Sequence, residues 1–186
     1  AREKFSAAAL PRLTIAIPGR YTTAALLLRM YSPVALTTRV MRFDQIMPAI
    51  VAGEVDAGVI IHESRFTFPA HGLLLLQDLG AWWEQETGLP IPLGGIVAKR
   101  SLGKERIQAI DRGIRASVAA AFAGPEASMP YIRQYAQELD DKVIREHIGL
   151  YVNQFSLDLG EEGLGAVREF MERGRQLGIF PRDSAD

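Results

Sequence analysis

The chain has 186 residues, of which 48% are apolar and 23% are charged, as expected of a folded protein with one ample domain or two small lobes. Its 21 basic and 22 acidic residues give a net charge of −1, which favours neither nucleic acid nor an anionic membrane as a partner. Cysteine is absent, so disulfides, thiolate nucleophiles and cysteine metal ligands are excluded. The three histidines lack the H-E-x-x-H spacing and no apolar run could span a bilayer, so we expect neither a metal site nor a membrane segment.

The first hundred residues alternate between strand and helix patterns. Short apolar runs predict strands at residues 13–17, 36–41, 55–61, 73–76 and 95–98. Helical patterns occupy residues 24–30, 45–51 and 78–86. Thr22–Thr23, Asp44 and Asp78 are the expected N-caps of these three helices. The order predicts an α/β fold that begins with a βαβαβ unit of parallel strands.

After Ser101 only helical patterns follow, at residues 107–122, 125–137, 140–151 and 161–177. These amphipathic helices must bury their apolar faces, yet no second sheet is predicted for them. They either pack on one another or cover a sheet that lies before Ala1. Because the first residues lack an initiator Met and a signal-type apolar core, we expect the chain to start inside a longer protein.

The predicted domain division follows from these patterns. Residues 1–12 would be a linker from a missing N-terminal segment, 13–100 an α/β lobe and 101–186 the helical part of the other lobe.

The most informative segment is the apolar run of residues 55–61, which ends in His62-Glu63-Ser64-Arg65. Ligands of open α/β sheets bind at the carboxyl ends of the strands. Since unperturbed histidine titrates near pH ~6.5, His62 is a candidate base that Glu63 or Arg65 would tune or orient. No Gly-x-Ser-x-Gly sequence surrounds Ser64, which argues against a serine hydrolase. The residues alone leave a second reading open, in which His62 and Arg65 satisfy backbone carbonyls.

A second loop, Pro18-Gly19-Arg20-Tyr21-Thr22-Thr23, joins a strand to a helix N-terminus at the same predicted edge. Free backbone N–H groups and two hydroxyls there suit a carboxylate or phosphate. The alternative is that Thr22 is simply an N-cap. Further along, Asn153 offers an amide that could reach a ligand, although nothing local requires it.

Several stretches resemble the 1,4-dihydroxy-6-naphthoate synthases of the futalosine route of menaquinone biosynthesis. The specific ones are His62-Glu63-Ser64-Arg65-Phe66-Thr67, Trp82-Trp83 and Thr87-Gly88-Leu89-Pro90. The similarity also covers residues 18–23, 53–61, 78–84, 87–95 and 151–158.

The resemblance implies a type II periplasmic-binding-protein-like fold, with two α/β lobes joined by a hinge and the substrate in the cleft. The N-terminal part of the first lobe would be missing from this chain. His62 would be the catalytic base. The substrate-binding residues would be Gly19, Arg20, Thr22, Thr23, Glu63, Ser64, Arg65 and Asn153.

The implied activity is that of a cytoplasmic carbon–carbon lyase without a cofactor, which converts cyclic dehypoxanthinyl futalosine to 1,4-dihydroxy-6-naphthoate. Two rivals share the fold: a non-catalytic solute-binding or ligand-sensing domain, and the chorismate dehydratase of the same pathway. The implied partner is a small-molecule substrate, and the sequence leaves open whether two copies form a homodimer.

Overall fold

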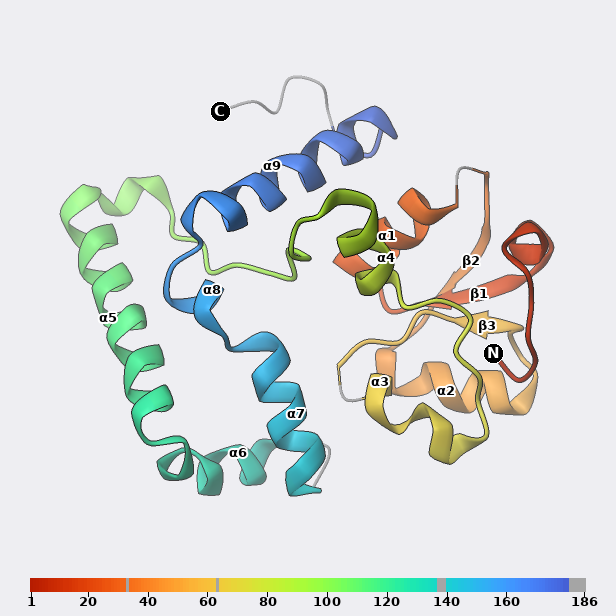
Figure 1. Ribbon diagram of the computed structural model, residues 1–186, viewed down its shortest axis with the longest axis horizontal. Helices are drawn as coiled ribbons and strands as arrows, with labels where there is room; N and C mark the ends of the chain where they lie inside the picture. The colour runs from red at the N-terminus through yellow and green to blue at the C-terminus, as the bar shows by residue number, and fades with distance from the viewer. Residues whose placement is uncertain (33, 63, 137–139, 181–186) are drawn as a thin grey trace. The chain divides into compact units, whose positions relative to one another are not determined.

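The computed structural model describes residues 1–32, 34–62, 64–136 and 140–180 (Figure 1). The chain forms two compact units, Ala1–Pro92 with Glu162–Asp186 and Leu93–Glu161. This division differs from the predicted one, because the boundary lies before residue 100 and the C-terminal residues belong with the α/β unit. Residues 1–12, expected to be a linker, contribute Leu10 and Phe5 to that unit's core. The assignment of the parts to lobes of a longer protein stays a prediction.

A three-stranded parallel sheet forms the centre of the first unit. Its strands are β1 (Thr14–Ile17), β2 (Thr37–Val40) and β3 (Ala57–Gly58), in the order β2-β1-β3. Ile15 is aligned with Thr38 on one side and with Ala57 on the other. The predicted parallel βαβαβ unit is therefore confirmed.

Helices α1 (Thr23–Tyr31) and α2 (Phe43–Ala52) connect the three strands. Successive side chains of β1 point to opposite faces of the sheet. Ile15 and Ile17 share a buried cluster with α1, whereas Ala16 packs with α2 residues Ile46 and Ile50. The two helices thus cover opposite faces (Figure 1).

A third cluster joins α1 to α4 (Leu79–Thr87) and to α9 (Gly160–Gln176). Trp83 of α4 is fully buried, and its ring lies edge-on to Phe170 of α9 with centroids 5.5 Å apart. The Trp83 indole N–H donates to the Pro90 carbonyl at 3.1 Å. The remaining elements of this unit are α3 (Ser64–Thr67) and the 3-10 segments η1 (Ala7–Arg12) and η2 (Phe68–His71).

Several local predictions are wrong. Residues 73–76 and 95–98 form no strand; Leu75 is 56% and Val97 is 92% exposed. In the 55–61 run only Ala57 and Gly58 are in the sheet. Asp44 does not cap α2, because the helix begins at Phe43, two residues earlier than predicted, with Arg42 as its N-cap. An apolar run indicates that its residues tend to be buried, but it does not show that there is a neighbouring strand with which they can pair.

The second unit is helical, as predicted. It contains α5 (Lys104–Ala123), α6 (Met129–Tyr135), α7 (Asp141–Tyr151), α8 (Gln154–Leu157) and the 3-10 segments η3 (Arg100–Leu102) and η4 (Pro125–Ala127). Asp140 caps α7 as expected, since its side chain accepts from the backbone N–H groups of Lys142 and Val143. None of the 20 residues of α5 is buried.

Exposed ion pairs link three segments of this unit. The guanidinium of Arg133 binds Asp141 and that of Arg145 binds Glu126. Hydrogen bonds from these guanidinium groups hold the pKa of both carboxyls below its usual value. A depressed carboxyl pKa stabilises the fold above the unfolded-state pKa, and this contribution is lost as pH falls through the folded-state value. Because all four groups are exposed, the effect is small.

A substitution at Gly58 tests whether β3 approaches α2 closely. A Cβ atom there would lie 2.4 Å from the Ile46 Cγ2 atom and 2.9 Å from the Ile50 Cδ1 atom. We expect Gly58→Ala to lower the free energy of unfolding by about 1–3 kcal/mol, measured by chemical denaturation. Gly165→Ala in α9 is the matched control, since nothing lies within 4 Å of its added Cβ. An unchanged midpoint for Gly58→Ala would contradict the close packing.

Candidate active site

Three loops leave the sheet at the carboxyl ends of its strands. The chain runs from β1 through Pro18–Thr22 into α1, from β2 directly into α2 at Phe43, and from β3 through His62 into α3. Two hydrogen bonds extend the pairing beyond the strands, from Val59 N to Ala16 O (2.8 Å) and from Met41 N to Ile17 O (3.1 Å). Because the strands are parallel, all three loops start at one edge.

His62 has an unusual backbone. Its φ of 58° makes it the one non-glycine residue with positive φ in the described part of the chain. This left-handed conformation costs an L-residue about 1–2 kcal/mol, although histidine tolerates it better than most. The side chain is half-buried, and its ring lies edge-on to Phe43 with centroids 4.9 Å apart at 66°. Residues held in such conformations cluster at functional sites.

The residues after His62 connect the loop to α4. Ser64 begins α3 and is buried. Arg65 donates to one carboxylate oxygen of Asp78 at 3.0 Å. The other Asp78 oxygen accepts from the backbone N–H groups of Gly80 (2.9 Å) and Ala81 (3.1 Å), so Asp78 caps α4 as predicted. Arg65 therefore holds α3 against α4, and a substrate contact by Ser64 or Arg65 stays a prediction. Glu63 lies outside the described residues.

The Pro18–Thr23 loop shows that Thr22 is an N-cap. Its hydroxyl accepts from Ala25 N at 3.2 Å and donates to Gly19 O at 2.9 Å. This confirms the capping alternative, but a hydroxyl oxygen keeps a second lone pair for another donor. Arg20 is exposed, and Thr23 is the first, half-buried residue of α1. The substrate contacts predicted for Gly19, Arg20, Thr22 and Thr23 are untested.

Asn153 lies in the second unit and caps α8. Its side-chain oxygen accepts from Phe155 N at 3.0 Å, and its amide nitrogen donates to Leu150 O at 3.2 Å. Ser156 completes a capping box by accepting from Asn153 N at 3.1 Å. The sequence pattern did not predict this short helix, and a ligand contact by Asn153 stays a prediction.

Among the described residues, no group of three or more His, Asp or Glu side chains could hold a metal ion. No described helix has the length and apolar character needed to cross a membrane.

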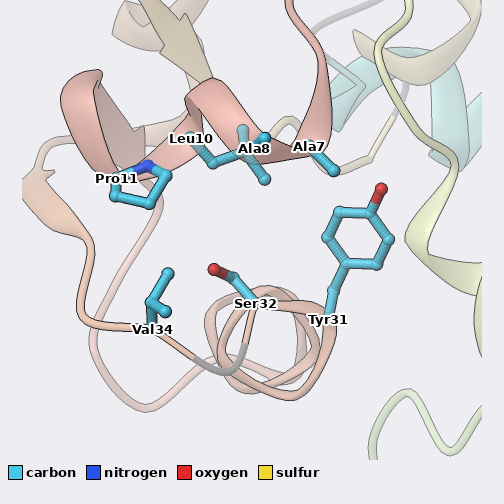
Figure 2. A pocket seen from close by; sticks show the side chains of 7 residues that line it. All are labelled: Ala7, Ala8, Leu10, Pro11, Tyr31, Ser32 and Val34. Atoms are coloured by element: carbon cyan, nitrogen blue, oxygen red, sulfur yellow. The ribbon is translucent and has the colours of Figure 1, made fainter.

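One cavity of about 330 Å³ lies between η1 and the end of α1 (Figure 2). Ala7, Ala8, Leu10, Pro11, Tyr31, Ser32 and Val34 line it. Because η1 precedes β1 and α1 runs back along the sheet, this cavity lies at the amino edge, opposite to His62.

The sequence is similar to proteins of a known family. Residues 2–176 match the family model described as "Menaquinone biosynthesis". The chain belongs to this menaquinone biosynthesis family. It is 52% identical over 171 residues to a 1,4-dihydroxy-6-naphthoate synthase of Thermus thermophilus, covering 92% of this chain and 62% of the relative. It is 47% identical over 173 residues to a synthase of the same name from Streptomyces coelicolor, covering 90% and 61%.

The fold is also shared with a solved protein. A crystal structure of an Archaeoglobus fulgidus protein aligns with a TM-score of 0.90 at 33% identity, covering 97% of this chain and 67% of that one. The α/β class, helix-rich with a small parallel sheet, is therefore confirmed. The chain spans about three fifths of the length of the curated relatives that it matches.

The left-handed backbone at His62 predicts which of two variants, His62→Gly or His62→Ala, is more stable. Glycine adopts positive φ without the steric cost that alanine incurs. We expect His62→Gly to be more stable than His62→Ala by about 1 kcal/mol in chemical denaturation. If the alanine variant is as stable as the glycine variant, the assigned backbone conformation is wrong.

Substitutions of Asp78 test its two roles, which are to bind Arg65 of α3 and to cap α4. Asp78→Asn keeps an oxygen that can cap α4 but removes the charge that Arg65 binds, so it should cost at most about 1 kcal/mol of unfolding free energy. Asp78→Ala removes both and should cost about 1 kcal/mol more, as loss of an N-cap does. Equal unfolding midpoints for the two variants would contradict the capping role.

Proposed function

We propose that this chain carries the catalytic loop of a 1,4-dihydroxy-6-naphthoate synthase, a carbon–carbon lyase acting on cyclic dehypoxanthinyl futalosine. The position and the backbone conformation of His62 are the main support for this proposal. His62 follows a strand at the carboxyl edge of the sheet, has a strained backbone, and belongs to one of the stretches that resemble the family specifically. The names of two relatives at about half identity support the same activity.

In the proposed mechanism His62 starts ring scission by taking a proton from the substrate. A neutral imidazole presents one nitrogen lone pair for this task, and its other nitrogen donates a hydrogen bond. His62 is half-buried, so the residue is not closed off from solvent. The reaction proposed here requires neither a metal nor a redox cofactor.

The Pro18–Thr23 loop would anchor a polar or carboxylate end of the substrate. It leaves the same sheet edge as the His62 loop. The first turn of α1 directs free N–H groups and the positive end of the helix dipole toward this edge. Thr22 and Thr23 add hydroxyls at the same point.

We also propose the two-lobed, periplasmic-binding-protein-like architecture, with part of the first lobe outside this chain. The division into two compact units supports it. So does the second unit, where Ile110 is 39% and Phe122 is 44% exposed although both belong to the apolar stripe of α5. The greater length of the relatives is consistent with further chain that covers this stripe. Closure of the lobes would exclude water from the substrate.

A solute-binding or ligand-sensing domain, and a chorismate dehydratase, are the alternatives. A binding domain needs a cleft but no base. The relatives' names favour the synthase over both. A cytoplasmic location is part of the proposal, and the oligomeric state stays open.

The test is His62→Asn in the intact natural protein. Asparagine also tolerates a left-handed backbone, so the loop conformation should be kept while the base is lost. We expect turnover to fall by about 10²–10⁴-fold, with substrate affinity within a few-fold of wild type. Product is measured by chromatography and binding by calorimetry.

His71→Ala is the matched histidine control, since His71 is exposed at the end of η2 and should not affect turnover. Near-normal turnover of His62→Asn would overturn the assignment of the base.

A further inference from the structure

Phe43 brings a second carboxyl-end loop into contact with His62. It is the first residue of α2, and only Met41 and Arg42 separate it from β2. Its ring lies edge-on to the imidazole, with centroids 4.9 Å apart and planes at 66°. Aromatic pairs favour this arrangement at centroid separations of about 4.5–7 Å.

The two partners differ in how firmly the fold holds them. Phe43 stands between two well-anchored segments: Met41 N binds Ile17 O at 3.1 Å, and Ile46, one helical turn later, is fully buried. His62 lies in a loop, beyond the last sheet-type hydrogen bond at Val59. A side chain on a loop reaches a precise orientation only when a rigid neighbour supports it.

Phe43 is not one of the residues that build the core. It is half-buried and belongs to none of the three hydrophobic clusters of the described residues. Loss of its ring should therefore affect the orientation of His62 more than the stability of the fold.

We propose that Phe43 is a positioning residue, whose ring restricts the rotation of the His62 side chain and holds the imidazole in the orientation that proton transfer needs. The left-handed backbone at His62 sets the direction of the Cα–Cβ bond. Phe43 then limits the torsions that remain. This inference rests on the proposed function, in which His62 is the base.

The first measurement is independent of catalysis. An aromatic ring shifts the NMR signals of protons close to it, and the chain has only three histidines to assign. In Phe43→Leu the imidazole signals of His62 should move toward their values in an unfolded peptide, and their nuclear Overhauser contacts to residue 43 should weaken. Phe43→Tyr keeps the ring and should preserve both.

The second measurement separates kcat from KM in the intact natural protein. A misplaced base slows the chemical step without weakening substrate binding, so Phe43→Leu should lower kcat by about tenfold or more, with KM within about twofold. Phe43→Tyr should restore most of kcat. If Phe43→Leu fails to fold, Phe43→Met takes its place, since the flexible, unbranched methionine side chain fills irregular gaps without a ring.

Phe5→Leu is the matched control, because Phe5 is also a half-buried phenylalanine, packed on the hydrophobic cluster that contains Leu10. It should change neither kcat nor the His62 signals. The inference is overturned if Phe43→Leu keeps a wild-type kcat, or if Phe5→Leu lowers kcat equally. Failure of the proposed function would show separately: the His62→Asn variant would be active, while the NMR signals of the unsubstituted protein would still show the Phe43–His62 contact.

Discussion

The candidate site depends on the parallel pairing of β1 with a strand on each side. This pairing places the ends of β1, β2 and β3 at one edge, where Thr22, Phe43 and His62 follow within a few residues. A parallel sheet must be covered on both faces. Here α1 and α2 cover the two faces of β1, whereas the four residues of the outer strand β2 are exposed. Helix α2 approaches the sheet closely because Gly58 has no side chain.

Several polar side chains near this edge serve structural roles. Thr22 caps α1, and Asp78 caps α4 while binding Arg65. These interactions fix the loops that precede and follow the candidate base. His62 differs from these residues in its left-handed backbone and in its edge-on contact with the ring of Phe43. That contrast separates the candidate base from its scaffold.

Features that depend on neighbours in sequence could be predicted. The caps at Thr22, Asp78 and Asp140, and the alternation of strand and helix up to Gly58, all follow from local patterns. The apolar runs at 73–76 and 95–98 were misleading, because strand pairing depends on contacts with residues distant in sequence, which an apolar run does not show. The contact of Phe43 with His62 joins residues far apart in sequence, and no local pattern indicates it.

The most direct test is incubation of the intact natural protein with cyclic dehypoxanthinyl futalosine, followed by mass spectrometry of the products over time. If the protein is a synthase, we expect 1,4-dihydroxy-6-naphthoate to accumulate through many turnovers per protein molecule. Recovery of the substrate unchanged, although the protein binds it, would contradict the proposed synthase activity and favour a ligand-binding role.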